Sequence, residues 1–544
     1  MLRNRACDAL NRAGFIAARH EELEPLAAQL AQSVRRLQEP MRVAVAGLIK
    51  RGKSTLVNAL LGGDITPTGS EETTFNVVEL HYGNTPGFEV CYKDGRTDDF
   101  SDIELLHRFV ARQASAPSVL SGIDRIYVSY PSQLLKAFRI LDIPGLGSVF
   151  EADSLNAMER LGLSPQSVAA ESLTVVDQAD AVVYLFNRAL AVSDAEIVRE
   201  FGGSAVHHLS PVKAIGVLSR VDDYWPPRRG PGEHLDLAAY DPLDRAASIV
   251  DRYLTETKAA DIFYDIKPVI GKLAVGAAAA SEVDVGHLKV LAGIAPELLF
   301  RRLRDAQLFA TRDFPDIPLD RLVRVGLVQL FGAYGVYLAT RLIAAGADDA
   351  ELRAELFAHS GVGAVRDVIV SHFGNRADLI KLAAILADLD AERACLRPSL
   401  SARAAEALTE IGRVLGQLRA AEHGFRELDA LHAYYQLRAD HRQGRAQVEL
   451  SNGQAQEFLR MTGEHGLSCA DRLGCAAATA TAELLQMAEA RLACWRQLAM
   501  DPTIDRAISP IVDFMTVAYE LLWHHVHEAQ RHLAFEQDRV TVPG

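Results

Sequence analysis

Apolar and polar residues follow two different patterns along the chain. Between Met41 and Glu282, short runs rich in Val and Ile alternate with stretches in which apolar residues recur every three or four positions. Such alternation is typical of an α/β domain. We therefore predict a mainly parallel sheet with helices on both faces. The predicted strands are RVAVAG, NVVELHY, FEVCY, RIYVSY, FRILDI, AVVYLF, AIGVLS and IKPVIG, and FEVCYKDGRTDDF is expected to form a hairpin at Asp94-Gly95.

The two flanking parts of the chain show only the helical spacing. Residues 1–39 carry apolar positions three and four apart and end at Pro40, which predicts a helical arm. Residues 283–544 continue the helical spacing, which predicts an extended all-helical bundle against which the arm packs. Within it, residues 399–449 form either one long helix or two helices broken near His423-Gly424. The predicted domains are residues 1–39, 40–282 and 283–544.

The longest apolar run is the candidate for a membrane-spanning helix. It is VGLVQLFGAYGVYLAT at residues 325–340. Its sixteen residues lie between Arg324 and Arg341. A spanning helix needs roughly 20 apolar residues, so we expect a buried helix of the helical bundle, with membrane contact as the alternative.

Charge and cysteine content narrow the function classes. The formal net charge of −14 argues against broad nucleic-acid binding, which needs a positive surface to displace counterions. The six cysteines form no CxxC pair, so neither a zinc site nor a disulfide framework is indicated. The first residues, MLRNRACDALNRAGF, lack the apolar core of a signal peptide. We expect a cytoplasmic protein.

The stretch GLIKRGKST, residues 47–55, has the spacing of a phosphate-binding loop. Glycines let the backbone wrap around phosphate oxygens, and the helix that follows offers its positive end. Lys53 adds a charge for the outer phosphates, and the Ser54 hydroxyl is a ligand for Mg²⁺. A predicted strand precedes the loop and an amphipathic stretch follows it, as this chemistry requires. The candidate phosphate-binding residues are Gly47, Lys50, Arg51, Gly52, Lys53, Ser54 and Thr55.

Two further segments follow the loop at sequence separations that suit the other Mg²⁺-binding and phosphate-binding parts of such a site. The predicted strand RILDI ends in Asp142-Ile143-Pro144-Gly145, where the acid is expected beside Mg²⁺ and the Gly145 amide near the third phosphate. The polar segment DITPTGSEETTF contains Thr73 and Thr74, and a hydroxyl there can complete the Mg²⁺ shell when the third phosphate is present. The alternative is that both threonines simply enter a strand.

Two segments near residues 220 and 270 indicate which nucleotide base is bound. Ser219-Arg220-Val221-Asp222 resembles the Asn/Thr-Lys-x-Asp element of GTPases, whose Asp accepts hydrogen bonds from guanine; adenine has no matching donor pair. Arg220 departs from the usual Lys, although its stem can cover the base face. Gly271 and Lys272, one strand later, are expected near the base or ribose. Leu146 stands where Ras-type GTPases have a water-positioning Gln, so water must be positioned differently here.

Taken together, GLIKRGKST, TPTGSEETT, DIPGL and SRVD resemble the motifs of bacterial dynamin-like GTPases, most closely the actinobacterial isoniazid-inducible branch. The resemblance implies a Mg²⁺-dependent GTPase that dimerises across its nucleotide sites and binds and remodels membrane. It also implies a homodimer, or a heteromer with a paralogous dynamin-like protein. The alternative is a scaffold that hydrolyses GTP slowly and pairs with such a paralogue.

The resemblance also assigns roles to single residues. It makes Thr74 the switch threonine that helps hold water, Asp142 the acid at the Mg²⁺ shell and Asp222 the guanine reader. Lys50 occupies the position of a cation-coordinating Ser in eukaryotic dynamins, so it is a candidate catalytic residue. The alternative is a solvated lysine.

Family members insert a trunk tip into membrane, and residues 428–445 combine aromatic and basic side chains that suit anionic lipid. The alternative is core packing with a solvated basic face. A tip there would make the protein peripheral at the inner face of the cell membrane. The candidate lipid-binding residues are Tyr434, Tyr435, Leu437, Arg438 and Arg442.

Overall fold

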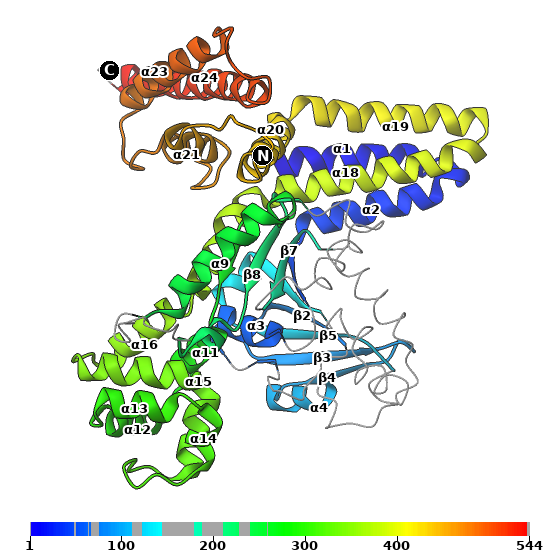
Figure 1. The fold of residues 1–544 in the computed structure, drawn as a ribbon. Coiled ribbons are helices and arrows are strands. Elements are labelled where there is room, and N and C mark those ends of the chain that lie inside the picture. Colours follow the sequence, from blue (N-terminus) through cyan, green and yellow to red (C-terminus); the bar gives the residue numbers. More distant parts are fainter. Residues whose placement is uncertain are drawn as a thin grey trace.

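The computed structural model describes residues 2–47, 51–63, 65–66, 76–110, 122–143, 179–187, 210–227, 240–257 and 259–540. These residues form one sheet of nine strands in the order β4-β3-β5-β2-β6-β1-β7-β8-β9, with helices around it (Figure 1). The strands are β1 (Met41–Gly47), β2 (Val77–Tyr82), β3 (Gly87–Tyr92), β4 (Thr97–Phe100), β5 (Ile123–Tyr130), β6 (Phe138–Asp142), β7 (Ala181–Phe186), β8 (Ala214–Leu218) and β9 (Ile266–Pro268).

The half of the sheet that carries the candidate site is parallel. Strand β1 pairs in parallel with β6 and β7, and β7-β8-β9 continue in parallel. Strand β2 pairs antiparallel with β6, and β3 pairs antiparallel with β4 and β5. The predicted hairpin is confirmed, with Gly95 at φ 86° between β3 and β4. The predicted mainly parallel α/β sheet is therefore confirmed.

Both faces of the central strands are covered, as the unbroken apolar runs predict. In β1, Val43 and Val45 face one hydrophobic core, and Ala44 and Ala46 face another. This alternation follows from the two-residue period of a strand. The helices of this domain are α3 (Lys53–Leu61), α4 (Leu106–Val110), α9 (Pro242–Glu256), α10 (Ala259–Ile262) and α11 (Gly271–Ala279), with the 3₁₀ turns η2 (Ile103–Leu105), η3 (Gln133–Lys136) and η6 (Val221–Tyr224).

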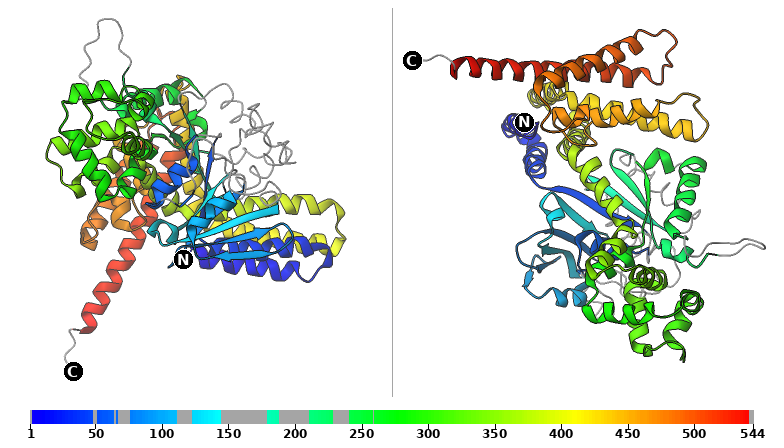
Figure 2. Two further views of the ribbon diagram at one scale, coloured as in Figure 1. Left: turned by 90° about the horizontal axis from the view of Figure 1, so that it is seen from below. Right: turned by 90° about the vertical axis from the view of Figure 1, so that its left-hand side faces the viewer.

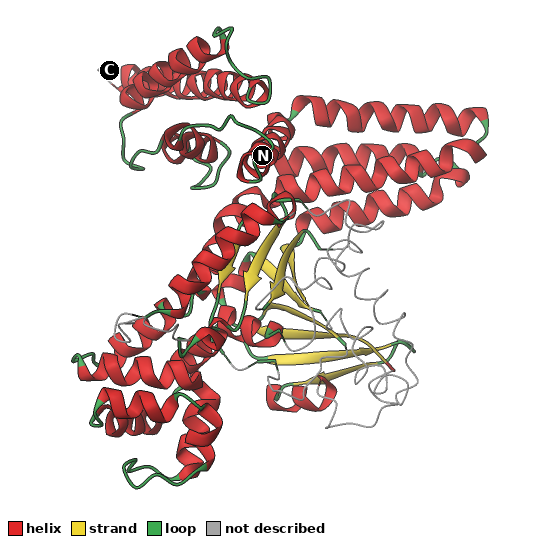
Figure 3. Ribbon diagram, viewed as in Figure 1, coloured by secondary structure: helices red, strands yellow, loops and turns green. Residues whose placement is uncertain are grey.

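Apart from a short helical segment at residues 362–376, the other described helices fall into three groups (Figures 2 and 3). We call them the base-side helices, the arm bundle and the C-terminal helices. The base-side helices are α12 (Glu282–Ala292), α13 (Pro296–Leu303), α14 (Ala306–Thr311), α15 (Arg321–Ala344) and α16 (Asp349–Ala358). The arm bundle is α1 (Leu2–Ala17), η1 (Glu21–Leu23), α2 (Glu24–Gln38), α18 (Ala377–Leu396), η9 (Arg397–Ser399) and α19 (Ala402–Ala421). The C-terminal helices are α20 (His423–Arg442), α21 (Asn452–Met461), α22 (Cys469–Leu473), α23 (Thr481–Ala499) and α24 (Ser509–Val540).

The three groups differ in how they pack. The arm bundle has a core of its own, built from Ala, Leu and Ile residues that come mainly from its four long helices. The base-side helices instead share one core with β1, β7 and β8. The C-terminal helices share the core on the opposite face of the sheet. Residues 399–449 form two helices, with the break at Glu422, next to the predicted point.

Helix α15 contains the apolar run at 325–340. Among the described residues it is the one helix whose length and composition would allow it to cross a membrane, and half of its most apolar 18-residue window is buried within the protein. Its buried residues, including Leu327, Phe331 and Val336, belong to the core shared with the sheet. The structure therefore agrees with the expectation of a buried helix. The helix packs against the sheet domain, however, and not only against other helices of a bundle.

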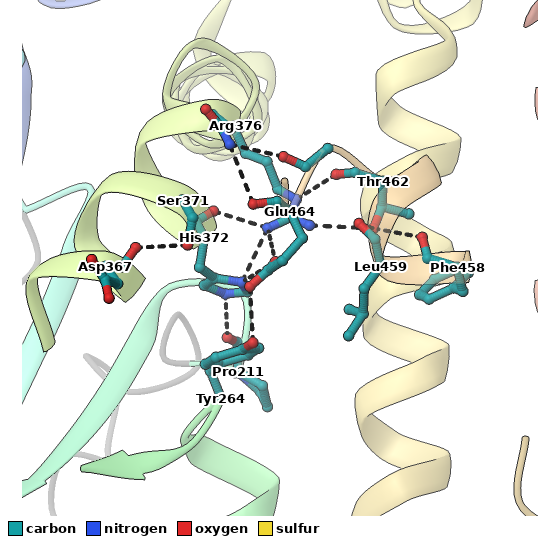
Figure 4. Close-up of polar contacts among 12 residues, drawn as sticks. Pro211, Tyr264, Asp367, Ser371, His372, Arg376, Phe458, Leu459, Thr462 and Glu464 are labelled. Carbon is teal, nitrogen blue, oxygen red and sulfur yellow. Dashed lines mark hydrogen bonds and ion pairs between the residues drawn. The ribbon is translucent and has the colours of Figure 1, made fainter. Parts of the chain in front are cut away.

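A buried ionic cluster joins the sheet domain to the helices (Figure 4). We call it the ionic junction and define it by Tyr264, His372, Arg376 and Glu464. Glu464 accepts hydrogen bonds from Arg376 Nη1 at 2.7 Å and from the Tyr264 hydroxyl at 2.8 Å. His372 lies in a π-helical turn, η7 (Ile369–Phe373), between α17 (Val362–Val368) and the 3₁₀ turn η8 (Gly374–Arg376).

The imidazole of His372 bridges the two sides of the ionic junction. Its Nε2 lies 3.0 Å from the Pro211 carbonyl oxygen in the sheet domain, and its Nδ1 lies 3.1 Å from Glu464 Oε2. Burial lowers the pKa of His372. The imidazole therefore connects Pro211, just before β8, to Glu464 among the helices.

A second buried contact connects the arm bundle to the first strand. Lys381 of α18 is 1% exposed, and its Nζ donates to the carbonyl oxygens of Leu37 at 3.0 Å and Glu39 at 2.5 Å. These carbonyls lie at the end of α2, where C-terminal oxygens have no partner within the helix and attract a cation. The lysine thus fixes the point at which the chain enters β1.

Candidate functional site

The phosphate-loop residues lie between the central strand and a helix N-terminus. Strand β1 ends at Gly47 and α3 begins at Lys53. Gly47 has φ 144°, and a Cβ there would lie 2.4 Å from the Leu185 carbonyl oxygen, so the backbone passes β7 too closely for any side chain. Gly52 precedes α3 in the left-handed region, with φ 85°. These conformations favour glycine and aim the first amides of α3 toward the loop.

Lys53, Ser54 and Asp142 meet beneath this loop. The parallel pairing of β1 with β6 places Asp142 opposite Val45, near the start of the loop. The Ser54 hydroxyl donates to Asp142 Oδ2 at 2.9 Å, and Lys53 Nζ lies 3.3 Å from the Gly47 carbonyl oxygen. Burial raises the pKa of Asp142 to about 6 and lowers that of Lys53 to about 8. In both groups burial disfavours the charged form, and the opposite charge of the other group partly offsets it.

The oxygen atoms at this point fit a divalent cation. Asp142 Oδ1 is buried and has no hydrogen-bond partner among the described residues. A buried carboxylate oxygen without a partner is unfavourable, and an Mg²⁺ ion would satisfy it. The hydroxyl of Ser54 and the carboxylate of Asp142 are the oxygen donors that Mg²⁺ prefers.

The predicted base-reading residues lie at the ends of the next two parallel strands. Asp222 lies in η6, just beyond the end of β8, and Arg220 precedes it with φ 57°. Burial, and then the neighbouring charge of Asp223, raise the pKa of Asp222, whereas the charge of Lys272 opposes this rise. Arg220 Nε lies 3.5 Å from Asp223 Oδ2. A partly buried carboxylate that lines the cavity suits a ligand that brings hydrogen-bond donors.

The fifth predicted segment packs against the phosphate helix. Gly271 and Lys272 begin α11 after β9, and a Cβ on Gly271 would lie 3.0 Å from Thr55 Cγ2. The phosphate and base segments are therefore in contact. Both line one cavity of about 1130 Å³, large enough for a nucleotide. Its lining includes Arg51, Gly52, Thr55, Arg220, Asp222, Gly271 and Lys272.

Two features of this cavity are absent from the sequence-based prediction. Arg51 Nη1 donates to Asn187 Oδ1 at the end of β7, which fixes one side of the loop. Part of the remaining wall comes from α15, through residues that include Gln329, Gly332 and Tyr334. In the sequence, the contribution of α15 is indicated only by a glycine inside its apolar helical run.

Several predicted site residues lie outside the described residues. They are Lys50, Thr73, Thr74, Gly145 and Leu146. The predicted catalytic roles of Lys50 and Thr74, the Mg²⁺ role of Thr74 and the phosphate contact of Gly145 stay predictions.

The candidate lipid-binding segment lies inside the protein in this structure. Tyr434, Tyr435 and Leu437 of α20 are 7%, 3% and 5% exposed and belong to the core shared with the sheet. Arg438 and Arg442 are partly buried. Further along the segment, Gln443 donates to the Thr257 carbonyl and Arg445 pairs with Asp261, so the segment contacts the sheet domain and is not a tip. The burial favours the core-packing alternative.

Comparisons with known proteins identify relatives across most of the chain. The profile of the dynamin family matches residues 43–201. The isoniazid-induced protein IniC of Mycobacterium tuberculosis is 30% identical over 482 residues, covering 88% of each chain. The dynamin-like protein 2 of Campylobacter jejuni is 29% identical over 133 residues, covering 24% of this chain and 21% of the relative.

Among solved structures, one described as "An oligomerised bacterial dynamin pair provides a mechanism for the long range sensing and tethering of membranes" matches 98% of this chain and 74% of its own. The match has 13% identity and a TM-score of 0.30. The phosphate loop lies at the start of the family match, and the similarity to IniC extends over the helical regions as well. The chain belongs to the dynamin family, as a bacterial dynamin-like protein with a GTPase domain.

Proposed function

We propose that this chain binds GTP with Mg²⁺, hydrolyses it to GDP and phosphate, and uses the cycle to control dimerisation and membrane association. One observation carries the nucleotide part of this proposal: residues from three separate segments line one cavity, and a fourth segment adjoins the first of them. The lining includes Arg51, Gly52 and Thr55 around the phosphate loop, Asp222 after β8, and Gly271 and Lys272 at the start of α11. The fourth segment is the end of β6, where Asp142 accepts a hydrogen bond from Ser54, the neighbour of Thr55.

The residues of the loop would stabilise charge on the phosphates. The first amides of α3 lie at a helix N-terminus directly after the loop in the chain, and Lys53 there is buried. In a site from which water is excluded, such preorganised donors stabilise developing negative charge strongly. Ser54 and Asp142 would hold Mg²⁺, which when bound neutralises charge on the outer phosphates.

The carboxylate of Asp222 would select the base. Two adjacent acceptor oxygens match the N1–H and N2–H donors of guanine, and adenine offers no equivalent pair on that edge. Lys272, at the start of α11, lies close enough to affect the pKa of Asp222 and would flank the base or ribose. We therefore expect guanine nucleotides to bind much more tightly than adenine nucleotides.

Titration calorimetry with GTP and ATP, each with Mg²⁺, tests the nucleotide part. We expect binding of GTP, weak or no binding of ATP, and steady release of phosphate from GTP. Lys53→Ala should abolish GTP binding, whereas Lys289→Ala, an exposed lysine paired with Asp349, should not change it. Equal affinity for the two nucleotides would contradict the role of Asp222.

Dimerisation and membrane association rest on the family alone and need their own tests. Sedimentation velocity with GDP and aluminium fluoride should show a dimer that GDP alone does not produce. Pelleting with anionic liposomes should increase with GTP. Phosphate release with and without liposomes separates an active remodelling GTPase from the slow scaffold, which would bind GTP but turn over at the same low rate in both.

A further inference from the structure

Helix α15 is bent where it meets the cavity. Residues on both sides of Gly332 are helical, but Gly332 itself has φ 70° and ψ 168°. The bend interrupts the regular backbone hydrogen bonds of the helix, which is unfavourable in an apolar environment unless something else requires it. Such a deviation inside a long apolar helix calls for a local cause.

The bend brings the helix backbone onto the base-reading residues. A Cβ built on Gly332 would lie 3.3 Å from Asp222 Oδ2 and 3.7 Å from Lys272 Cδ. The backbone of α15 therefore passes in close contact with the carboxylate that faces the cavity. A residue with a side chain would crowd Asp222 and would also be strained at this φ.

Close packing against α11 fixes α15 in this place. A Cβ on Gly276 of α11 would lie 2.5 Å from Phe331 Cδ1, and a Cβ on Gly335 of α15 would lie 2.8 Å from Leu273 Cδ2. The two helices approach so closely because glycines replace side chains on both. Since α11 begins at Gly271-Lys272, the base segment and α15 form one packed unit.

The same helix is tied to the rest of the base-side helices. The Tyr334 hydroxyl is hydrogen-bonded to Asp241, the N-cap of α9, and Asp241 also contacts His359 Nδ1 at the end of α16 at 3.0 Å. Further toward its start, buried Arg324 donates to the carbonyl oxygens of Phe309 and Arg312 at 2.6 and 2.9 Å. Through these contacts, directly or by way of Asp241, α15 is connected to α9, α14 and α16.

We propose that α15 is a base-contacting wall of the nucleotide site, so that a guanine base on Asp222 packs against the backbone at Gly332 beside Gln329, and base occupancy fixes the position of the base-side helices. This inference rests on the proposed binding of guanine nucleotides. By linkage, helix position and base affinity must influence each other equally. We expect the base and not the phosphates to act on α15, because the atoms nearest to Gly332 among the described residues belong to Asp222 and Lys272.

Binding of GDP and of inorganic tripolyphosphate, each with Mg²⁺, to the full chain tests the inference. Gly332→Ala should weaken GDP binding at least tenfold and leave tripolyphosphate binding within twofold of wild type. Gly346→Ala is the matched control: it lies just beyond the end of α15 with φ 99°, and a Cβ there meets nothing within 4 Å. It imposes comparable backbone strain without touching the site, so both affinities should stay unchanged.

Each outcome bears on the inference. Wild-type affinity for GDP in Gly332→Ala overturns it, as does an equal loss of GDP and tripolyphosphate binding. Failure of the wild-type chain to bind GDP at all, with tripolyphosphate bound, contradicts the proposed function itself.

Hydrogen exchange of the wild-type chain gives a second measurement that does not depend on a variant. GDP should slow exchange of backbone amides around Gly332 by at least tenfold, whereas tripolyphosphate should slow exchange only around the phosphate loop. Equal protection of α15 by both compounds would overturn the inference, because it would show that phosphate occupancy and not the base acts on the helix.

Discussion

Replacing Glu464 by Gln removes the carboxylate that faces Arg376 in the ionic junction. Arg376 is 2% exposed, so its guanidinium would remain buried without an opposite charge. Breaking a buried pair in this way costs about 3–5 kcal/mol. The Gln carbonyl keeps a neutral acceptor for Arg376 and Tyr264, so we place the loss of stability near the lower end, at about 3 kcal/mol.

The assay must report on this region, because a chain of several packed units does not unfold in one step. We would follow hydrogen exchange of amides in η7, η8 and the end of α21. A loss of about 3 kcal/mol corresponds to roughly two orders of magnitude in the opening equilibrium. Asp390→Asn is the control, because its pairs with Arg393 and Arg419 are exposed, and such pairs contribute about 0–1 kcal/mol. An effect of Glu464→Gln as small as that of the control would refute the reasoning.

The same variant has a defined pH dependence. Burial opposes ionisation of Glu464, but contacts with His372 and Arg376 outweigh it and leave its pKa below the usual range. Its stabilisation is therefore present above the ordinary Glu pKa of about 4.3 and is lost as the pH falls further. The difference between wild type and variant should be constant near neutral pH and shrink below about pH 4.5. His372, whose pKa is also lowered, adds a loss of stability that begins near pH 6.5 and affects both proteins.

Three further changes test the nucleotide site and its supports. Asp222→Asn should lower GTP affinity at least tenfold and raise affinity for xanthosine triphosphate, measured by titration; unchanged GTP affinity would exclude direct base contact. Gly47→Ala should lower the melting temperature and abolish GTP binding, because a Cβ would clash with a β7 carbonyl oxygen. The control is Gly62→Ala, with φ 75° and open space around the Cβ, which should lower the free energy of unfolding by only about 1 kcal/mol. Arg324→Lys should lower the free energy of thermal unfolding by about 1–3 kcal/mol, because it leaves a buried carbonyl oxygen without a donor. Arg321→Lys, at an exposed arginine, should leave this free energy unchanged.

The sheet and the phosphate side of the site follow from local patterns in the sequence. The apolar run RVAVAG needs both of its faces covered, and the structure places its Val and Ala residues in two cores. Lys53, Ser54 and Asp142 lie together because the parallel register of β1 and β6 is set by those same runs. Spacing along the chain is sufficient there, since each residue lies at the end of a buried strand.

The parts that the sequence did not predict depend on contacts between distant segments. Nothing local in α15 reveals that Gly332 faces Asp222, because the approach depends on Gly276 and Gly335 lying opposite Phe331 and Leu273. In the same way, the composition of residues 428–445 suits a lipid surface and a buried helix equally well. Only the position of α9 and α10 beside α20 decides between them in this structure.

The buried Lys381 has a mechanical consequence for a protein of this family. It fixes the end of α2 to α18, and the next residues form β1, which is hydrogen-bonded along both edges to β6 and β7. A strand held on both sides does not stretch, so β1 behaves as a short stiff rod about 23 Å long, at about 3.3 Å per residue. A pulling force on the arm bundle would therefore enter the sheet at β1 and be shared with β6 and β7, and β1 and β6 end at Gly47 and Asp142 of the candidate site.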